Sequence, residues 1–255
     1  MDEGIQHFPL KNGSIKQSMT KAIICAAGRG NRLSRYTEEY PKALLPIGKK
    51  QVIKHILETL FSSGITDVII VVGYMKEAVI SCIGKEYKGC SITYVSNDDF
   101  DFSDNLYSMW LARDHVVNGM LFVNGDTVFH MDILKNFLAH KIENAVVVDT
   151  VNKEDNPVSA HISDGCVMEI GHDIENQSHG DVFGIYKLSQ TASERYFSIA
   201  DKIFTQGPQK GGFFIPLQQM VPEIKIEPFF SDDSRWVNIN NEKDYKRAQH
   251  LFGNL

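Results

Sequence analysis

The chain has 255 residues, of which 43% are hydrophobic and 23% are charged, values that are ordinary for a soluble globular protein with one large core. Its formal net charge of −6 provides no overall basic field, so neither nucleic acid nor an anionic membrane is expected as a partner. No segment reaches the roughly 18 consecutive apolar residues that mark a membrane-spanning helix.

Residues 1–20 contain no apolar core of the kind that a secretory signal carries, and we expect them to form a flexible extension. The cysteines are widely spaced and form no C-x-x-C motif; they are Cys25, Cys82, Cys90 and Cys166. This usage predicts reduced thiols and a cytoplasmic protein.

Residues 21–150 alternate short apolar runs with helical patterns. Strands are predicted at Ala22–Ala26, Asp67–Val72, Ser91–Val95, Met120–Asn124 and Ala145–Thr150. Helices are predicted between them at Gln51–Ser63, Lys76–Ile83, Asp104–Val117 and Asp132–His140. Asp104 stands where it can cap the third helix. The repeated β-α-β order predicts an α/β fold, with a Rossmann-like, mostly parallel sheet and helices on both faces.

The regular alternation of strand and helix patterns changes after Thr150. A hairpin is predicted at Asn156–Ile170, with further strands at Asp181–Lys187 and Lys225–Pro228 and helices at Ser193–Phe204 and Asn241–Leu251. We therefore expect one domain over residues 21–255, in which a core at 21–150 is followed by additions at 151–255. These additions form a small C-terminal α+β lobe across the front edge of the sheet.

The strongest functional signal is a glycine-rich turn after the first strand. It consists of Ala26, Ala27, Gly28, Arg29 and Gly30, and Arg32 and Lys42 follow it. Such a turn can bring backbone N–H groups close to phosphate oxygens, and glycine leaves room for the ligand. The two cations downstream are available for the remaining phosphate charge. The turn is not a Walker P-loop, because no Gly-Lys-Ser/Thr closes it, and it is not a dinucleotide-binding G-x-G-x-x-G, because Leu33 stands three positions after Gly30.

The longer string A-A-G-x-G-x-R-L, with P-K-x-L-L-P-I at Pro41–Ile47, resembles the opening of the nucleotidyltransferases that activate sugar 1-phosphates and small phospho-alcohols. This resemblance implies the nucleotide-diphospho-sugar transferase type of fold. It also implies that the glycine turn binds the nucleotide, that Arg32 contacts the β- and γ-phosphates, and that Lys42 reaches the α-phosphate or the acceptor phosphate. Residues 21–150 would then be the nucleotide-binding core, with the acceptor-side additions after it.

The tripeptide Asn124-Gly125-Asp126 follows a predicted strand at its carboxyl end. A lone carboxylate there can hold Mg²⁺ while phosphate oxygens and water complete the octahedron, although the same tripeptide is also a good turn. Its position matches the Gly-Asp motif of the same enzymes. The resemblance therefore implies that Asp126 binds Mg²⁺.

Those enzymes supply a second carboxylate near the C-terminus, and here the matching string is N-I-N-N-E-K-D-Y at Asn238–Tyr245. The metal position falls on Asn240, whose uncharged amide oxygen should bind Mg²⁺ more weakly. Asp232 or Asp233 could compensate. We interpret Asp244 as a charge at the start of the last helix.

The segment Ser96–Ala112 is the most informative about substrate. It lacks the G-L-A-x-A or G-T-A-x-A string of sugar-1-phosphate enzymes that use UTP or dTTP. Instead, Asn105-Leu106-Tyr107-Ser108 resembles the N-x-Y-S string of bacterial phosphocholine cytidylyltransferases, and residues 21–248 as a whole look like that subgroup. The residues predicted to contact the acceptor are Asp104, Asn105, Tyr107, Ser108, His172 and Asp181. Asn97, by its loop position, is a candidate for reading the base edge.

The loop before this helix crowds carboxylates and aromatic rings, namely Asp98, Asp99, Asp101 and Asp104 with Phe100, Phe102 and Tyr107. Such a set suits an ammonium group, although an ordinary solvated acidic loop would have the same composition. Many sugar-activating relatives carry a second lysine in V-x-x-I-x-K, where this chain has His172. The charge of a histidine varies with pH in the neutral range.

The expected function is therefore Mg²⁺-dependent transfer of CMP from CTP to a small phosphomonoester or phosphonate with an ammonium group, such as phosphocholine. A sugar-1-phosphate nucleotidyltransferase that uses UTP, dTTP or GTP is the alternative within enzymes. A non-catalytic nucleotide-binding regulatory subunit is an alternative of another class, motivated by Asn240 and His172. The sequence leaves the oligomeric state open, with a homodimer as one option.

Overall fold

The computed structural model describes residues 21–152 and 157–254. The predicted extension at 1–20 and the first residue of the predicted hairpin, Asn156, lie outside this range. The centre of the sheet consists of four parallel strands in the order β7 (Met120–Asn124), β1 (Lys21–Ala26), β4 (Asp67–Val72) and β6 (Cys90–Ser96). The apolar runs of β7, β1 and β4 are almost completely buried, as strands covered on both faces must be, whereas Tyr94 and Val95 of β6 are partly exposed. The predicted α/β fold with its parallel core is confirmed.

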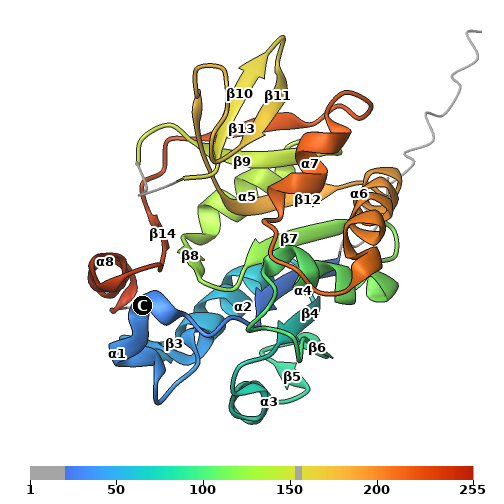
Figure 1. Cartoon of the computed structure of the whole chain (residues 1–255). Coiled ribbons are helices and arrows are strands. Elements are labelled where there is room, and N and C mark those ends of the chain that lie inside the picture. The colour runs from blue at the N-terminus through green and yellow to red at the C-terminus, as the bar shows by residue number, and fades with distance from the viewer. Residues whose placement is uncertain (1–20, 153–156, 255) are drawn as a thin grey trace, which may run out of the picture.

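The sheet continues on the β7 side with strands from the second half of the chain (Figure 1). β12 (Gly180–Leu188) is antiparallel to β7 and to β9 (Ala145–Asp149), and β13 (Glu227–Ser231) is parallel to β9. The predicted hairpin is formed by β10 (Ser159–Ser163) and β11 (Cys166–Gly171), and it flanks the start of β12. On the opposite edge, the short β5 (Glu86–Tyr87) pairs with β6.

The position of β9 differs from the one that a continued β-α-β pattern would give, which is next to β7 and parallel to it. It follows α5 (Met131–Ala139) but does not lie next to β7, because β12 occupies that place and runs antiparallel. Parallel pairing therefore ends at β7 and the flank of the sheet is mixed. The additions after residue 150 share this sheet with the core.

Helices cover both faces, as predicted. On one face lie α2 (Val52–Ser62), α3 (Lys76–Ile83), α5 and α8 (Glu242–Phe252), and on the other lie α4 (Asn105–Leu111), α6 (Gln190–Ile203) and α7 (Phe214–Met220). The alternation along β1 decides which core each side chain joins. Ala22 and Ile24 pack with the first set of helices, and Ile23 packs with the second.

Helix α4 is shorter than predicted, and a 3₁₀ turn at Arg113–His115 follows it. Asp104 occupies the N-cap position, but its side chain makes no capping hydrogen bond. The predicted cap is therefore wrong, and this carboxylate is exposed instead. The interpretation of Asp244 is confirmed, because Asn241 and Asp244 form a reciprocal capping box at the start of α8.

Short elements that the sequence patterns did not reveal complete the fold. They are α7, the pair β8 (Thr127–Phe129) and β14 (Trp236–Asn238), and the pair β2 (Pro46–Ile47) and β3 (Lys50–Gln51). The pairing of β8 with β14 has a direct consequence for the site. It brings the segment that contains Asn240 beside Asp126, whose carbonyl accepts a hydrogen bond from Ile239 N at 2.9 Å.

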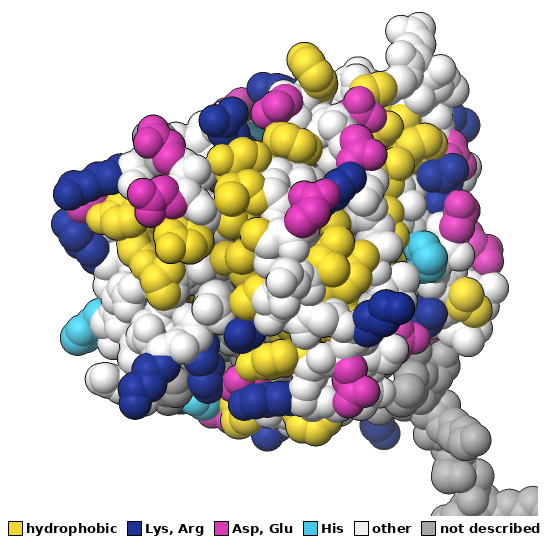
Figure 2. All heavy atoms as spheres, turned by 90° about the horizontal axis from the view of Figure 1, so that it is seen from below, with side chains coloured by type: hydrophobic (Ala, Val, Ile, Leu, Met, Phe, Trp, Pro, Cys, Tyr) yellow, Lys and Arg dark blue, Asp and Glu magenta, His cyan; other side chains and the backbone are white. Residues whose placement is uncertain are grey.

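The described residues contain no helix of the length and apolar character that crossing a membrane demands. On the face shown in Figure 2, Lys and Arg side chains are interspersed with Asp and Glu rather than gathered into one patch. Each of the cysteines Cys25, Cys82, Cys90 and Cys166 is free, as predicted.

A polar cluster around Glu58 joins α2 to the β5 edge. Its carboxylate is hydrogen-bonded by Lys50 Nζ at 2.7 Å and Tyr87 Oη at 3.0 Å, and Lys88 Nζ lies 2.8 Å away. Burial raises the pKa of Glu58, but these partners lower it more strongly, to about 2. Because the pKa is lower in the folded chain, the cluster stabilises the fold fully above about pH 5 and loses this effect as the pH falls from 4.5 toward 2.

We expect Glu58→Gln to lower the free energy of unfolding at pH 7 by roughly 1–3 kcal/mol. The variant should also lose less stability than the wild type between pH 5 and pH 2. Denaturant unfolding across this pH range measures both effects. Glu39→Gln, at an exposed position, is the matched control, and equal pH profiles for wild type and Glu58→Gln would refute the role of the cluster.

Candidate active site

A cavity of about 720 Å³ opens beyond the carboxyl ends of the parallel strands. This is where ligands bind in open α/β sheets, and the volume is that of an ordinary ligand site. The predicted residues that line it are Ala26, Ala27, Gly28, Arg29, Gly30, Arg32, Lys42, Asn97, Asp104, Asn105, Ser108, Asp126, His172 and Asn240. Tyr107 and Asp181 are not among the lining residues.

The glycine turn forms one wall. Gly30 has φ +76, and its carbonyl accepts hydrogen bonds from Leu33 N at 2.8 Å and Thr37 Oγ1 at 3.1 Å. A Cβ at Gly28 would meet no atom within 4 Å, although Gly28 lines the cavity. The turn therefore leaves open space against its backbone, as a phosphate-binding turn requires.

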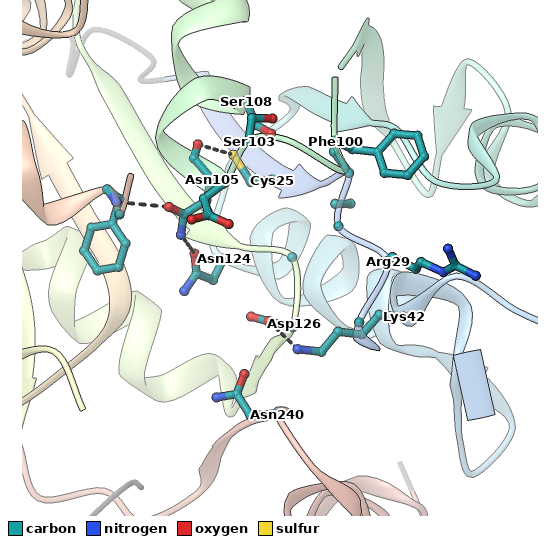
Figure 3. Close-up of a pocket in the computed structure, with 18 of the residues that line it drawn as sticks. Cys25, Arg29, Lys42, Phe100, Ser103, Asn105, Ser108, Asn124, Asp126 and Asn240 are labelled. Atoms are coloured by element: carbon teal, nitrogen blue, oxygen red, sulfur yellow. Dashed lines mark hydrogen bonds and ion pairs between the residues drawn. The ribbon is translucent and has the colours of Figure 1, made fainter. Parts of the chain in front are cut away.

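The electrostatic centre of the cavity is an ion pair between residues 84 positions apart. Lys42 Nζ lies 2.6 Å from Asp126 Oδ2, and the two side chains are only 13% and 26% exposed (Figure 3). The other oxygen, Asp126 Oδ1, is buried and has no hydrogen-bond partner among the described residues. A buried carboxylate oxygen without a partner is costly, so it indicates a site for a ligand that the protein itself does not supply.

Asn240 lies beside this pair, and its Oδ1 accepts a hydrogen bond from Arg32 Nη2 at 3.0 Å. Arg29 points away from it in Figure 3, with its guanidinium 5.1 Å from the ring centroid of Tyr74. The suggested compensation for Asn240 is not provided, because neither Asp232 nor Asp233 lines the cavity. The pKa of Asp233 is lowered by hydrogen bonds from Arg235, which engages that carboxylate at 2.7 Å.

Gly125 allows Asp126 to reach this position. Its N–H donates to the carbonyl of Cys25 at 3.1 Å, and a Cβ here would collide with that carbonyl oxygen. We expect Gly125→Ala to lower the free energy of unfolding by roughly 3 kcal/mol or more, because a backbone atom of β1 cannot yield as a flexible side chain would. Chemical denaturation of the wild type and of Gly125→Ala measures this loss of stability.

Gly28→Ala is the matched control, since its Cβ would meet only open space. Its stability should stay within about 0.5 kcal/mol of the wild type. Its nucleotide affinity should fall, because the added methyl group stands against the cavity. Equal stability losses in the two variants would contradict the close approach at Gly125.

The residues of the N-x-Y-S string are engaged in hydrogen bonds within the protein. Asn105 accepts from Phe213 N at 3.0 Å and donates to Asn124 Oδ1 at 3.4 Å. Tyr107 packs against Trp110 and Phe204, outside the cavity. Ser108 Oγ accepts from Asn97. The structure thus gives this string a framework of contacts that hold the cavity wall in place.

Asn97 is almost completely buried, and both of its amide hydrogens are engaged. Nδ2 donates to Ser103 Oγ at 3.1 Å and to Ser108 Oγ at 3.0 Å, while Oδ1 accepts from Asp99 N at 3.0 Å. Reading a base edge with these hydrogens would require one of the bonds to be given up. The geometry therefore favours a positioning role for Asn97 in shaping the loop.

Some residues of the acidic loop line the cavity, and others contact different parts of the protein. Asp101, Asp104 and Phe100 line the cavity. Asp98 instead pairs with Lys76 at 2.6 Å, and Asp99 accepts a hydrogen bond from the Tyr107 hydroxyl. Phe102 is 71% exposed and does not line the cavity. A smaller set than the sequence predicted thus faces a ligand.

The side of the cavity that is expected to bind the acceptor includes residues from the second half of the chain. His172 Nδ1 donates to the Pro157 carbonyl at 2.9 Å, and its ring makes an edge contact with Phe214. Asp181 on β12 is buried and accepts a hydrogen bond from Ser159 Oγ at 3.3 Å. Sequence reasoning missed the segment 210–214 (K-G-G-F-F), all of which lines the cavity. A lysine followed by two glycines was the sequence feature that could have indicated a ligand-binding segment here.

A glycine turn and a Lys–Asp pair at the carboxyl ends of parallel strands suit the binding of a phosphorylated ligand, and comparison with known proteins shows that the enzyme class is nucleotidyltransferase. The chain belongs to the MobA-like NTP transferase domain family, which matches residues 22–191. A solved structure of CTP:phosphocholine cytidylyltransferase from Streptococcus pneumoniae has the same fold, with a TM-score of 0.77 at 24% identity over 91% of this chain and 99% of that one.

Relatives in sequence include enzymes with different substrates. CMP-5′-(3-aminopropyl)phosphonate synthase of Streptomyces rubellomurinus is 36% identical over 126 residues, which are 49% of this chain and only 20% of that longer protein. Choline-phosphate cytidylyltransferase of Streptococcus pneumoniae is 25% identical over 236 residues, 92% of this chain and 99% of that protein. UTP–glucose-1-phosphate uridylyltransferase AglF of Haloferax volcanii is 28% identical over 135 residues, 52% of this chain and 55% of that protein.

Proposed function

We propose that this nucleotidyltransferase transfers CMP from CTP to a small phosphomonoester or phosphonate that bears an ammonium group, with release of pyrophosphate. The observation that carries the proposal is the Lys42–Asp126 pair at the mouth of an open glycine turn, in which Asp126 Oδ1 has no hydrogen-bond partner in the part of the chain that the structure describes. The choice of acceptor is supported by Asp101, Asp104 and Phe100 on the cavity wall, since carboxylates and an aromatic face attract ammonium groups. Likeness to a choline-phosphate cytidylyltransferase along nearly its whole length agrees with this choice.

The reaction needs charge neutralisation more than proton transfer. An anionic oxygen of the acceptor attacks the α-phosphorus of CTP, and a new P–O bond forms as the bond to the β-phosphate oxygen breaks. The electron pair leaves with pyrophosphate. Because the attacking oxygen is already anionic, no general base is required, and catalysis consists of positioning and electrostatic stabilisation.

Three parts of the chain would supply these effects. Lys42, once it exchanges Asp126 for a phosphate oxygen, neutralises charge at the reacting phosphorus. Arg32 and the amides of Gly28–Gly30 hold the pyrophosphate group as it departs. Arg32 must release Asn240 for this purpose, which leaves the Asn240 amide oxygen available as a ligand.

The residues present fit Mg²⁺. Asp126 provides a buried carboxylate oxygen that no residue of 21–152 or 157–254 engages, and Asn240 provides a neighbouring amide oxygen. Among the described residues no group of three or more His, Cys, Asp or Glu could hold a metal, which suits an ion that keeps several waters and binds mainly through substrate phosphates. When bound, Mg²⁺ supplies positive charge to the phosphate oxygens.

Transfer to a sugar 1-phosphate from UTP, dTTP or GTP is the second candidate, and the uridylyltransferase relative favours it. The test is pyrophosphate release with Mg²⁺, crossing the four nucleoside triphosphates against phosphocholine, 2-aminoethylphosphonate and glucose 1-phosphate. We expect turnover with CTP and an ammonium-bearing acceptor. Turnover confined to glucose 1-phosphate would overturn the acceptor assignment, and no turnover in any combination would reject the proposed reaction.

A further inference from the structure

The segment 207–213 connects the 3₁₀ turn Phe204–Gln206 to α7 and forms part of the cavity wall. Lys210, Gly211 and Gly212 all line the cavity, and Lys210 is exposed. No motif of the nucleotide-binding half includes this segment. Lys210 therefore adds a positive charge to the cavity beyond those of Arg29, Arg32 and Lys42.

The backbone on the C-terminal side of Lys210 is firmly anchored. The Gly211 carbonyl accepts a hydrogen bond from Leu106 N at 3.2 Å, and Phe213 N donates to Asn105 Oδ1 at 3.0 Å. The Phe213 carbonyl accepts from the buried Tyr196 hydroxyl at 2.9 Å. These bonds fix the segment to the start of α4 and to α6, and Figure 3 shows that Asn105, to which Phe213 is bonded, lies well apart from Arg29.

The other lining cations have partners on the nucleotide side. Lys42 pairs with Asp126, Arg32 with Asn240, and the Arg29 guanidinium lies over Tyr74. Within residues 21–152 and 157–254, no ion pair or hydrogen bond engages the ammonium group of Lys210. Its charge is thus available to an anionic ligand that enters from the acceptor side.

An acceptor of the proposed kind carries both signs of charge. Asp101 and Asp104 suit its ammonium end but repel its phosphate or phosphonate end. The ring of His172, which stands where sugar-activating relatives have a lysine, is already engaged through Nδ1 by the Pro157 carbonyl. The anionic end therefore requires a cation on this wall.

We propose that Lys210 binds the phosphate or phosphonate group of the acceptor and so helps to orient it toward the α-phosphorus. This inference rests on the proposed function and names a residue of the acceptor subsite. Lys210 selects for an anionic acceptor through its charge, and the segment that carries it is positioned by Asn105.

The test compares steady-state kinetics of the whole chain with CTP and either phosphocholine or 2-aminoethylphosphonate. We expect Lys210→Ala to raise the KM for the acceptor by about 10- to 100-fold, which corresponds to the loss of one charge-assisted hydrogen bond. CTP affinity, measured by calorimetry without acceptor, should stay within about twofold of wild type, because the other cations serve the triphosphate. Lys210→Arg should retain most of the acceptor affinity, and Lys202→Ala, at an exposed position of α6 outside the cavity, is the control.

The outcomes separate this inference from the proposed function. Normal turnover by the wild type with an unchanged acceptor KM in Lys210→Ala would overturn the role of Lys210 alone. A loss of CTP affinity equal to the loss of acceptor affinity would assign Lys210 to the nucleotide and overturn the inference as well. Absence of wild-type turnover with every acceptor would reject the proposed function and this inference with it.

Discussion

Replacing Lys42 by Ala should reduce kcat by about 10²- to 10³-fold while leaving the fold intact. The ammonium group is placed 2.6 Å from Asp126, at the point where the glycine turn and the end of β7 meet. In the proposed reaction it neutralises charge that increases at the reacting phosphorus, so its effect should be larger in the transition state than in the complex with CTP. Pyrophosphate release under saturating substrates measures kcat, and calorimetry measures CTP affinity.

Thermal unfolding provides the check on the fold of this variant. The side chains of the Lys42–Asp126 pair are mostly buried, so removing Lys42 should lower the free energy of unfolding by about 1–3 kcal/mol without unfolding the protein. Lys49→Ala, seven positions along the chain at an exposed site outside the cavity, is the matched control and should behave like the wild type. A loss of less than tenfold in Lys42→Ala would remove Lys42 from this role.

Replacing Asp126 by Asn should likewise reduce turnover by about 10²- to 10³-fold, because it removes the only carboxylate of the proposed metal site among the described residues. The change keeps the shape of the side chain, so stability should be preserved. It should also weaken binding of a divalent cation in the presence of CTP. Titration with Mn²⁺ followed by electron paramagnetic resonance measures this binding without reference to activity.

Two further variants make this experiment decisive. Asp164→Asn alters an aspartate in the hairpin turn, outside the cavity, and should change neither turnover nor Mn²⁺ binding. Asn240→Asp adds the carboxylate that related enzymes are expected to have, and it should lower the Mg²⁺ concentration needed for half-maximal turnover. Unchanged Mn²⁺ affinity in Asp126→Asn would refute the metal assignment, even if turnover fell.

Much of the nucleotide side could be predicted from local sequence. A buried parallel strand reads as a continuous apolar run, and a glycine turn directly after it falls at the carboxyl edge of the sheet wherever the strand packs. The same logic brought Asp126, after β7, to the same edge. Gly30 has the positive φ expected of such a turn. These features depend on chain order and residue type, which are explicit in the sequence.

The acceptor side depended on contacts between distant residues. The crowded acidic loop contributes Asp101 and Asp104 to the cavity but not Asp98 or Asp99, because Lys76 and the Tyr107 hydroxyl engage the latter two. Tyr107 itself packs against Phe204 of a later segment. Composition cannot separate these carboxylates, since the partner of Asp98 lies on α3 and the partner of Asp99 lies on α4, and only the tertiary structure brings them together.

The remaining differences have a common physical reason. The pairs β8–β14 and the helix α7 are too short to leave a periodic signal, and they exist because tertiary hydrogen bonds and burial stabilise them. Yet the β8–β14 pair brings Asn240 beside Asp126, and hydrogen bonds of the segment just before α7 hold Lys210 in the cavity wall. The amino-acid order alone determined the fold class, the phosphate-binding turn and the residues at the strand ends. Packing of segments far apart in the chain decided which charges face one another across the cavity.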